Sequence, residues 1–314
     1  MLVLGWRERR RIDLRGKVAL VIGGSRGLGL LVAKDLTRRG AKVAIAARNG
    51  LELRRAVETL GGDVRAFPCD VRDRDEVEAL MRRVESTLGA IDLLFNIAGV
   101  IEVGPEESMR TNDFGDAMAT NFWGPLFAAR AVLPSMRVRG RGRIINVSSI
   151  GGVVSAPHLL AYSASKFALR GFSEGLAAEV RKDGIYVTTV LPGLMRTGSP
   201  RHAKFKGDHE KEHAWFTIAD SLPLLSISAD RAARRIVRAG CRGEATVVLS
   251  PLAKVGAFLH GIAPSLVVEV NALLTRLLPR GTSPIARLGK ESTSAWAPSL
   301  LTVLDDRAAV RNNE

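Results

Sequence analysis

The chain has 314 residues, of which 46% are hydrophobic, and its formal net charge is +14 at pH 7. This composition excludes a disordered protein, and the length allows one large α/β domain with a sizeable core. The excess of Lys and Arg is spread along the whole sequence without a nucleic-acid recognition motif. The charge therefore favours anionic small ligands over nucleic acid.

Cysteine usage and the N-terminal residues indicate a cytoplasmic protein. Cys69 and Cys241 stand far apart, in no metal or redox spacing. The apolar run 1–6 is too short for a signal peptide and precedes its basic cluster, so we expect residues 1–13 to form a basic leader. Nor does any uninterrupted apolar run reach the ~18 residues that a membrane span needs.

A glycine-rich turn follows the first predicted strand, Lys17–Ile22, and precedes a helix that runs through Arg39. Gly23 allows a tight exit from the strand, Gly27 allows a pyrophosphate to approach, and Gly29 allows the helix to pack on the strand. The helix N-terminus would face the phosphates with unpaired amides. We assign six residues of this turn to cofactor binding: Gly23, Ser25, Arg26, Gly27, Leu28 and Gly29.

The end of the second predicted strand, Ala41–Ala46, distinguishes between cofactors. A site that prefers NAD places a carboxylate there, whereas this chain has Ala47 followed by Arg48. Arg48 and Arg26 together could bind a 2′-phosphate with two guanidinium groups, which predicts NADPH as the cofactor. The alternative is that either arginine is only a solvated surface charge.

Two further strands end in residues that suit the cofactor. After Val64–Phe67 come Asp70 and Val71, and Asp70 could accept a hydrogen bond from the adenine amino group or, alternatively, cap the next helix. Asp73 suits that capping role better. The strand Ile91–Phe95 leads to Asn96, Ala98 and Gly99, where the backbone can approach the cofactor.

The catalytic candidates lie around the next strand, Arg143–Val147. On a helix that begins near Tyr162, Lys166 lies one turn later on the same face. A nearby ammonium group favours phenolate, so we expect Lys166 to lower the pKa of Tyr162 and make it a general acid or base. Ser149, after the strand, could hydrogen-bond the same substrate oxygen.

Asn121 lies in the middle of the predicted helical segment 111–136. A buried asparagine inside a helix needs a hydrogen-bonding partner. It could bridge through water to Lys166, or it could satisfy a neighbouring backbone group.

The C-terminal third contains the remaining elements of the predicted sheet. The strand Ile185–Leu191 ends at Pro192 and Gly193, with Thr197 shortly after, and the last strand is 245–249. Residues 198–228 between them are an insertion at a strand end, where an α/β enzyme places its substrate lid. The histidines of this insertion have no carboxylate partners at a set spacing, so we expect no metal site.

Residues 251–314 form a C-terminal extension with two amphipathic segments, broken by Pro264, and a mixed tail from Gly281. The segments could cover the substrate cleft, pack in an oligomer or rest on a membrane surface, and the sequence leaves these alternatives open.

Over residues 14–250 the chain resembles the short-chain dehydrogenase/reductase family, in the branch that prefers NADP(H) and has a Tyr-x-x-x-Lys active site. The motifs that carry this resemblance occur in the family's order: Gly23, Gly27 and Gly29; Asp70; Asn96, Ala98 and Gly99; Asn121; Ser149; Tyr162 and Lys166; Pro192, Gly193 and Thr197. Two positions differ from the family pattern, Ile22 in place of threonine and Ile97 in place of a second asparagine.

The resemblance implies a fold and a set of roles. The fold is a doubly wound Rossmann fold with a seven-stranded parallel sheet and helices on both faces. Tyr162 would be the acid or base, Lys166 would also hold the nicotinamide ribose, Ser149 would orient the substrate oxygen, and Asn121 would keep a proton-relay water. The segment Pro192–Thr197 would contact the nicotinamide carboxamide, and many members are dimers or tetramers built on the helices that carry Asn121 and Tyr162.

We therefore predict an NADPH-dependent oxidoreductase that interconverts a ketone or aldehyde and an alcohol. Trp215 and Phe216 in the insertion, with the apolar C-terminal segments, favour a bulky apolar substrate. The alternative is a binding protein that keeps the dinucleotide site as a redox sensor or scaffold.

Overall fold

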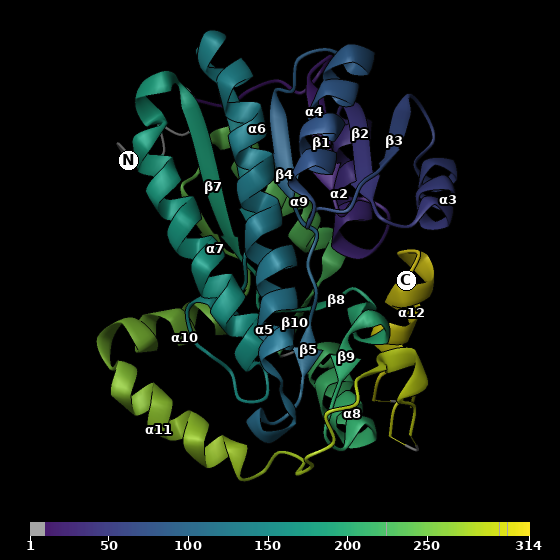
Figure 1. Ribbon diagram of the computed structural model, residues 1–314, viewed down its shortest axis with the longest axis vertical. Coiled ribbons are helices and arrows are strands. Elements are labelled where there is room, and N and C mark those ends of the chain that lie inside the picture. The colour runs from purple at the N-terminus through teal and green to yellow at the C-terminus, as the bar shows by residue number, and fades with distance from the viewer. Residues whose placement is uncertain (1–9, 224, 295, 300) are drawn as a thin grey trace.

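Seven parallel strands form the central sheet of the computed structural model, which describes residues 10–223, 225–294, 296–299 and 301–314. Most of the predicted leader lies outside these residues. The strand order is β11-β7-β6-β4-β1-β2-β3 (Figure 1). The strands are β1 (Val18–Ile22), β2 (Lys42–Ala47), β3 (Val64–Pro68), β4 (Leu93–Asn96), β6 (Gly142–Val147), β7 (Ile185–Leu191) and β11 (Thr246–Val248). Each corresponds to a predicted strand, and most are buried on both faces, as in a parallel sheet that helices cover. The edge strand β3 differs, because its Arg65 is exposed.

Helices cover both faces of the sheet, which confirms the predicted doubly wound fold. On one face, the core contains side chains from α2 (Gly27–Arg38), α3 (Gly50–Leu60) and α9 (Ala229–Arg242). On the other face, it contains side chains from α4 (Arg74–Leu88), α6 (Gly124–Val138) and α7 (Leu160–Glu179). The order reverses between β1 and β4, so the crevice at their carboxyl ends is the place where such folds bind ligands.

The predicted helical segment 111–136 is interrupted at Asn121. It consists of α5 (Thr111–Met118), a π-helical turn η2 (Ala119–Trp123) and then α6. Single π turns inside helices are frequent at functional sites. The turn directs Asn121 into a fully buried position beside α7.

The predicted insertion after β7 is folded rather than irregular. Its elements are η5 (Ser199–His202), β9 (Lys204–Phe205), α8 (His209–Ser221) and β10 (Ser226–Ser228). Strand β9 lies between β5 (Glu102–Val103) and β12 (Arg287–Leu288) in a small sheet, and β10 pairs with β8 (Leu194–Arg196). The insertion and the C-terminal extension therefore build a layer beneath the carboxyl ends of the main strands (Figure 1).

The C-terminal extension divides into two parts. Helices α10 (Pro251–Ile262) and α11 (Pro264–Thr275) project from one side of the molecule (Figure 1). After an irregular stretch with β12 and η6 (Gly289–Glu291), the chain crosses to the other side. There α12 (Val303–Arg311) packs against α8 and leads towards the glycine turn.

Candidate active site

Ser149 and Tyr162 come together at the carboxyl end of β6. Ser149 caps the short helix η3 (Ile150–Gly152), and its hydroxyl faces the phenol of Tyr162 in the first turn of α7, near enough to oppose the rise in the Tyr162 pKa. A Cβ atom added at Gly151 would lie 3.2 Å from the Tyr162 ring and 3.4 Å from the Ser149 Oγ. Gly151 therefore provides the space in which the two side chains meet.

Lys166 and Asn121 lie on the inner side of this pair. The Lys166 Nζ is 5.7 Å from the centre of the Tyr162 ring and donates a hydrogen bond to the carbonyl of Val147 at 3.0 Å. Both Lys166 and Asn121 are close to Gly99, where an added Cβ would lie 3.5 Å from Nζ and 3.1 Å from Oδ1. Four predicted residues thus converge on one end of the sheet.

Asn121 adopts the second of its two predicted roles. Its Oδ1 accepts a hydrogen bond from the Val100 amide, and its Nδ2 donates to the Val100 carbonyl and to Ser165 Oγ. The first two bonds satisfy both the amide and the carbonyl of Val100, in the segment after β4. The relay role implied by the family resemblance stays a prediction.

The predicted lowering of the Tyr162 pKa is wrong for this arrangement. Burial raises the pKa of Tyr162 above 10, although the Ser149 hydrogen bond opposes this rise. Burial also lowers the pKa of Lys166 to about 8, and its ammonium is directed to a backbone carbonyl rather than to the phenol. Desolvation by the surrounding core thus outweighs the expected attraction between ammonium and phenolate.

The glycine turn has the shape that a pyrophosphate requires. Gly23 and Gly27 have φ angles of +83° and +52°, in the left-handed region that favours glycine. A Cβ at Gly29 would lie only 1.8 Å from the Gly23 carbonyl, so this glycine allows α2 to pack against the end of β1. The N-terminus of α2 opens towards the crevice with Arg26 at its cap position.

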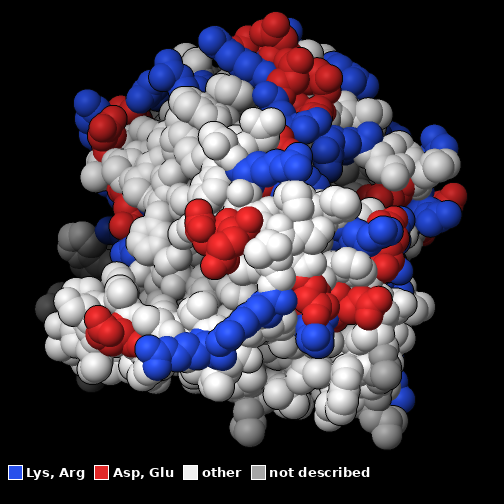
Figure 2. Space-filling model, turned by 60° about the horizontal axis from the view of Figure 1, so that its bottom comes forward, with Lys and Arg blue, Asp and Glu red and all other residues white. Residues whose placement is uncertain are grey.

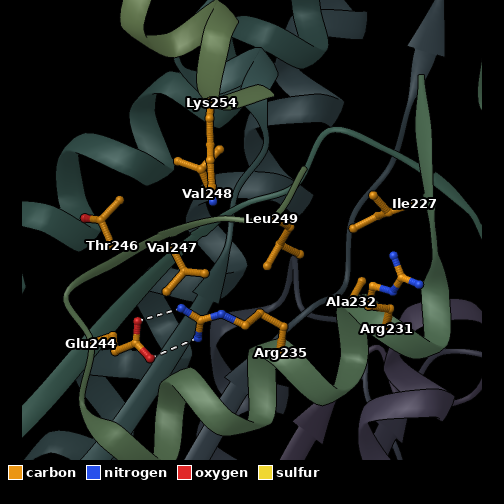
Figure 3. Close-up of a pocket in the computed structure, with 10 residues that line it drawn as sticks. All are labelled: Ile227, Arg231, Ala232, Arg235, Glu244, Thr246, Val247, Val248, Leu249 and Lys254. Atoms are coloured by element: carbon orange, nitrogen blue, oxygen red, sulfur yellow. Dashed lines mark hydrogen bonds and ion pairs between the residues drawn. The ribbon is translucent and has the colours of Figure 1, made fainter. Parts of the chain in front are cut away.

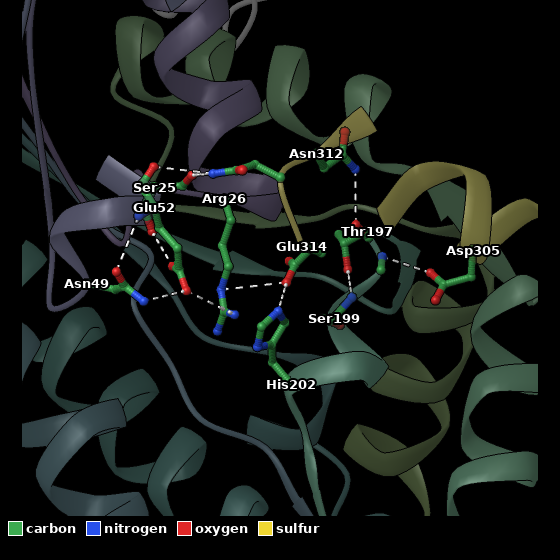
Figure 4. Close-up of polar contacts among 12 residues, drawn as sticks. Ser25, Arg26, Asn49, Glu52, Thr197, Ser199, His202, Asp305, Asn312 and Glu314 are labelled. Atoms are coloured by element: carbon green, nitrogen blue, oxygen red, sulfur yellow. Dashed lines mark hydrogen bonds and ion pairs between the residues drawn. The ribbon is translucent and has the colours of Figure 1, made fainter. Parts of the chain in front are cut away.

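The last residues of the chain lie in this turn (Figure 4). The Gly27 amide donates to the Asn312 carbonyl at 2.8 Å, and Asn313 Nδ2 donates to the Ser25 carbonyl, also at 2.8 Å. The Glu314 carboxylate is so close to Gly27 that an added Cβ would lie 2.4 Å from it. Nδ2 of Asn312 also donates to the Thr197 carbonyl at 3.0 Å.

The glycine turn thus has residues that fit a dinucleotide. In this structure, however, the chain's own tail lies where the dinucleotide would bind. The tail contacts both the turn predicted to hold the pyrophosphate and Thr197, which was predicted to lie beside the nicotinamide. The Glu314 carboxylate lies beside Gly27 and 3.5 Å from the Arg26 guanidinium, where an anionic pyrophosphate would also lie. A dinucleotide can lie across the turn only after the tail has withdrawn.

The two arginines predicted to bind a 2′-phosphate lie in different surroundings. Arg26 is between two carboxylates, 3.9 Å from Glu52 and 3.5 Å from Glu314. Arg48 is exposed at the end of β2, and no residue that the structure describes forms an ion pair with it. Arg48 is therefore available to an incoming phosphate, whereas Arg26 becomes available when the tail leaves.

Asp70 is held by its neighbour. Arg72 donates hydrogen bonds to the Asp70 carboxylate, at 2.6 Å for the shortest, and these bonds lower the pKa of Asp70. Asp73, and not Asp70, caps α4 through the amides of Asp75 and Glu76. The hydrogen bond between Asp70 and adenine stays a prediction, and the buried Val71 packs on Gly124.

Other predicted cofactor residues also have structural partners. Asn96 Nδ2 donates to Asn146 Oδ1 at 2.8 Å, so this side chain ties β4 to β6 inside the sheet. Ala98 donates its amide to the carbonyl of Ile22, and the carbonyl of Pro192 accepts from the amide of Ile150. Gly193 packs against Ser250, where an added Cβ would lie 2.5 Å from the Ser250 Oγ.

The two positions that differ from the family pattern are apolar and packed. Ile22 is buried on one face of the sheet, and Ile97 packs against the core on the other face. They are joined through the backbone, because the Ile97 amide donates to the Ile22 carbonyl at 3.0 Å. At each position, an apolar side chain packed in the core stands where the family pattern has a polar one, and the two side chains belong to the cores on opposite faces of the sheet.

The family model for short chain dehydrogenases matches residues 17–205 of this protein. The chain belongs to the short-chain dehydrogenase family. The matched region contains the glycine turn and all four predicted catalytic residues. This agrees with the resemblance found in the motifs.

Similar proteins agree with this assignment. The chain is 34% identical over 268 residues to a dehydrogenase/reductase SDR family protein 7-like of Anopheles gambiae, covering 82% of this chain and 83% of that protein. It is 39% identical over 192 residues to a fatty acyl-CoA reductase of Acinetobacter baylyi, covering 60% of this chain and 65% of that protein. A crystal structure of a short-chain dehydrogenase from Streptomyces avermitilis superimposes with a TM-score of 0.71 at 30% identity, covering 83% of this chain and 98% of that one.

The aromatic residues of the insertion in this short-chain dehydrogenase belong to its packing. Phe216 is buried against Phe205, and Trp215 Nε1 donates to Glu212 at 2.7 Å. His158 binds the other oxygen of the same buried carboxylate, at 2.7 Å. The two aromatic side chains therefore give no support to a bulky substrate.

Sequence reasoning missed several acidic residues near the crevice. Asp220 of α8 accepts the Met195 amide and lies near enough to Tyr162 to affect its titration. Asp305 accepts the Gly198 amide at 2.9 Å. Burial raises the pKa of Asp305 to about 6 and that of Glu314 to about 7. Only the long-range fold brings these carboxyl groups to the site, so no local pattern predicted them.

A pocket of about 390 Å³ lies away from the four converging residues (Figure 3). It is lined by residues of α9, β11 and the first turn of α10, among them Arg231 and Lys254. Arg235 in this pocket is already bound to Glu244 through two hydrogen bonds, at 2.9 and 2.7 Å. None of the predicted catalytic residues lines it.

Proposed function

We propose that this short-chain dehydrogenase reduces the carbonyl group of an apolar ketone or aldehyde with NADPH. The observation that carries the proposal is the position of the Ser149 hydroxyl beside the Tyr162 phenol around Gly151, with the Lys166 ammonium 5.7 Å from the phenol ring. A hydroxyl and a phenol that face each other can both hydrogen-bond one substrate oxygen. Reductases among the similar proteins, including the fatty acyl-CoA reductase, support this class of reaction.

Tyr162 can supply the proton that reduction requires. At neutral pH the phenol keeps its proton, so it can donate that proton to a carbonyl oxygen. Ser149 would donate a second hydrogen bond to the same oxygen and stabilise the charge that develops on it. Bound NADPH would supply the hydride. Lys166 would orient the cofactor ribose from its position beside Gly99.

NADPH is favoured over NADH by the residues after β2. The chain has Ala47 and Arg48 where an NAD site needs a carboxylate. Arg48 is exposed and can bind a 2′-phosphate, and the Arg26 guanidinium can join it once Glu314 has moved. Glu52 also lies beside Arg26, and its negative charge reduces the contribution of Arg26 to this preference.

One observation favours a second candidate, a protein that binds dinucleotide as a sensor. The tail lies in the glycine turn and would respond to the cofactor by leaving it. NADPH consumption with a series of aliphatic ketones and aldehydes separates the candidates, if it is measured on the full chain and on a chain that lacks residues 303–314. The proposed enzyme consumes NADPH in at least the shortened form and loses this activity with Tyr162→Phe. A sensor binds NADPH in both forms and consumes none.

A further inference from the structure

Helices α10 and α11 form an arm that scarcely packs on the rest of the protein. Ala253 is the one buried residue of α10, and all twelve residues of α11, each of them described, are at least partly exposed. The arm is held by contacts between α10 and the ends of β11 and η3. Asn271 of α11 adds a hydrogen bond from its Nδ2 to the Ser155 carbonyl at 2.9 Å.

The exposed side chains of this arm are large and apolar. Phe258 and Ile262 are each 66% exposed, and Leu277 just after α11 is 81% exposed. Eight others are about half exposed: Leu252, Val255, Leu259, Leu266, Val268, Val270, Leu273 and Leu274. Exposed apolar area of this extent marks an interaction surface, because water solvates it poorly.

The charges around the arm indicate which partner covers it. Within residues 251–280 the basic side chains are Lys254, Arg276 and Arg280, and the one acidic side chain is Glu269. Figure 2 shows this face of the molecule as mostly uncharged, with a band of basic side chains and smaller clusters of acidic side chains beside it. A second copy docked by two-fold symmetry would bring the same basic patch against itself. An anionic lipid surface would instead complement it.

The length of the helices fits binding in the plane of such a surface. Each helix has 12 residues, and across the described parts of the chain no helix is long and apolar enough to cross a membrane. Helices with basic residues beside a large apolar surface lie at the boundary between headgroups and acyl chains. Arg231, which lines the pocket at the root of α10 together with Lys254, adds positive charge beside the arm.

We infer that the α10–α11 arm docks this protein on an anionic lipid surface. The arm joins the body beside η3, which follows Ser149 directly, and it is bonded to Ser155 on the same loop. Docking would therefore place the end of the sheet that carries Ser149 close to the lipid. The inference depends on the arm alone and stands whether or not the proposed carbonyl reduction is correct.

Cosedimentation of the full chain with vesicles tests the inference. The vesicles contain either phosphatidylcholine alone or phosphatidylcholine with one third phosphatidylglycerol. We expect binding to the anionic vesicles that weakens with salt, and at least a tenfold loss of binding in the double variant Phe258→Ser, Ile262→Ser. The variant Leu51→Ser is the matched control, because Leu51 is 59% exposed on the distant helix α3 and should bind as wild type does.

Charge and oligomeric state complete the test. The variant Arg276→Gln, Arg280→Gln should bind anionic vesicles at least threefold more weakly, and its preference for them over phosphatidylcholine vesicles should become smaller. Absence of vesicle binding would overturn the inference. A second result would also overturn it: light scattering shows a dimer for the wild type and a monomer for the Phe258→Ser, Ile262→Ser variant, while both bind vesicles equally. The arm would then be a contact between two copies of the chain.

Discussion

The backbone amide of Gly27 donates a hydrogen bond to the carbonyl oxygen of Asn312, across 2.8 Å. The first residue is the glycine predicted to let a pyrophosphate approach, and the second belongs to the chain's own tail. A pyrophosphate bound at this turn would therefore compete with the tail for the Gly27 amide.

Removal of residues 303–314 should tighten NADPH binding. A cofactor that binds only after the tail withdraws has its affinity reduced by the fraction of molecules in which the tail is released. We expect the Kd of the shortened chain to be at least about tenfold lower than that of the full chain. This factor already follows if the tail is docked in about nine of ten protein molecules. Fluorescence titration with NADPH measures it. An equal or higher Kd, with the fold intact by circular dichroism, would show that the tail does not compete.

The same competition should depend on pH. Burial raises the pKa of Glu314 from 4.5 to about 7 in the docked tail, and a released tail would regain its ordinary value. The docked state therefore binds the proton more tightly, so docking is favoured at low pH and weakens as pH rises from about 4.5 to about 7. Asp305 acts in the same direction, because burial raises its pKa from 3.8 to about 6.

This sign predicts that the NADPH affinity of the full chain rises between pH 5.5 and 7.5 by about tenfold or more, since one pKa unit corresponds to a factor of ten. The shortened chain is the control, because it shares the titration of the cofactor phosphate and lacks Glu314. The variant Glu314→Gln should also flatten the difference. Parallel pH profiles for the full and shortened chains would contradict the account.

Arg48→Ala should lower the preference for NADPH. Its guanidinium is exposed and free to bind a 2′-phosphate, and loss of one such charged hydrogen bond costs about 1.5–3 kcal/mol, or roughly tenfold or more in affinity. The measurement compares Kd values for NADPH and NADH in the shortened chain, with Arg65→Ala on the neighbouring strand β3 as a matched control. An unchanged ratio would remove Arg48 from the site.

Asn146→Ala should destabilise the fold without touching the catalytic residues. Asn146 is fully buried and connects Asn96 of β4 to Ser173 of α7, with bonds of 2.8 and 3.0 Å. The substitution leaves both partners without one hydrogen bond, at a cost of about 1–3 kcal/mol for each unsatisfied buried group. Urea unfolding measures it. The exposed control Asn49→Ala should cost less, since it removes only the cap of α3.

The sequence predicted the sheet well because most strands are short, largely apolar runs between turns and helices. Asn121, Ser149, Tyr162 and Lys166 were likewise found by order and spacing along the chain. The pKa of Tyr162 was not, since desolvation depends on how the whole core surrounds the phenol. The tail was also missed, because contacts such as Gly27 with Asn312 join residues almost 300 positions apart, and no local pattern encodes them.

The most direct test of the proposed chemistry is NADPH consumption by the shortened chain with apolar ketones and aldehydes, compared between wild type and Tyr162→Phe. General acid catalysis by a positioned side chain contributes about 10²–10⁴-fold, so the variant should lose at least two orders of magnitude in kcat. Its NADPH affinity should stay close to that of wild type, because Lys166 and the glycine turn are intact. A Tyr162→Phe variant that reduces these substrates at the wild-type rate would contradict the assignment of Tyr162 as the proton donor.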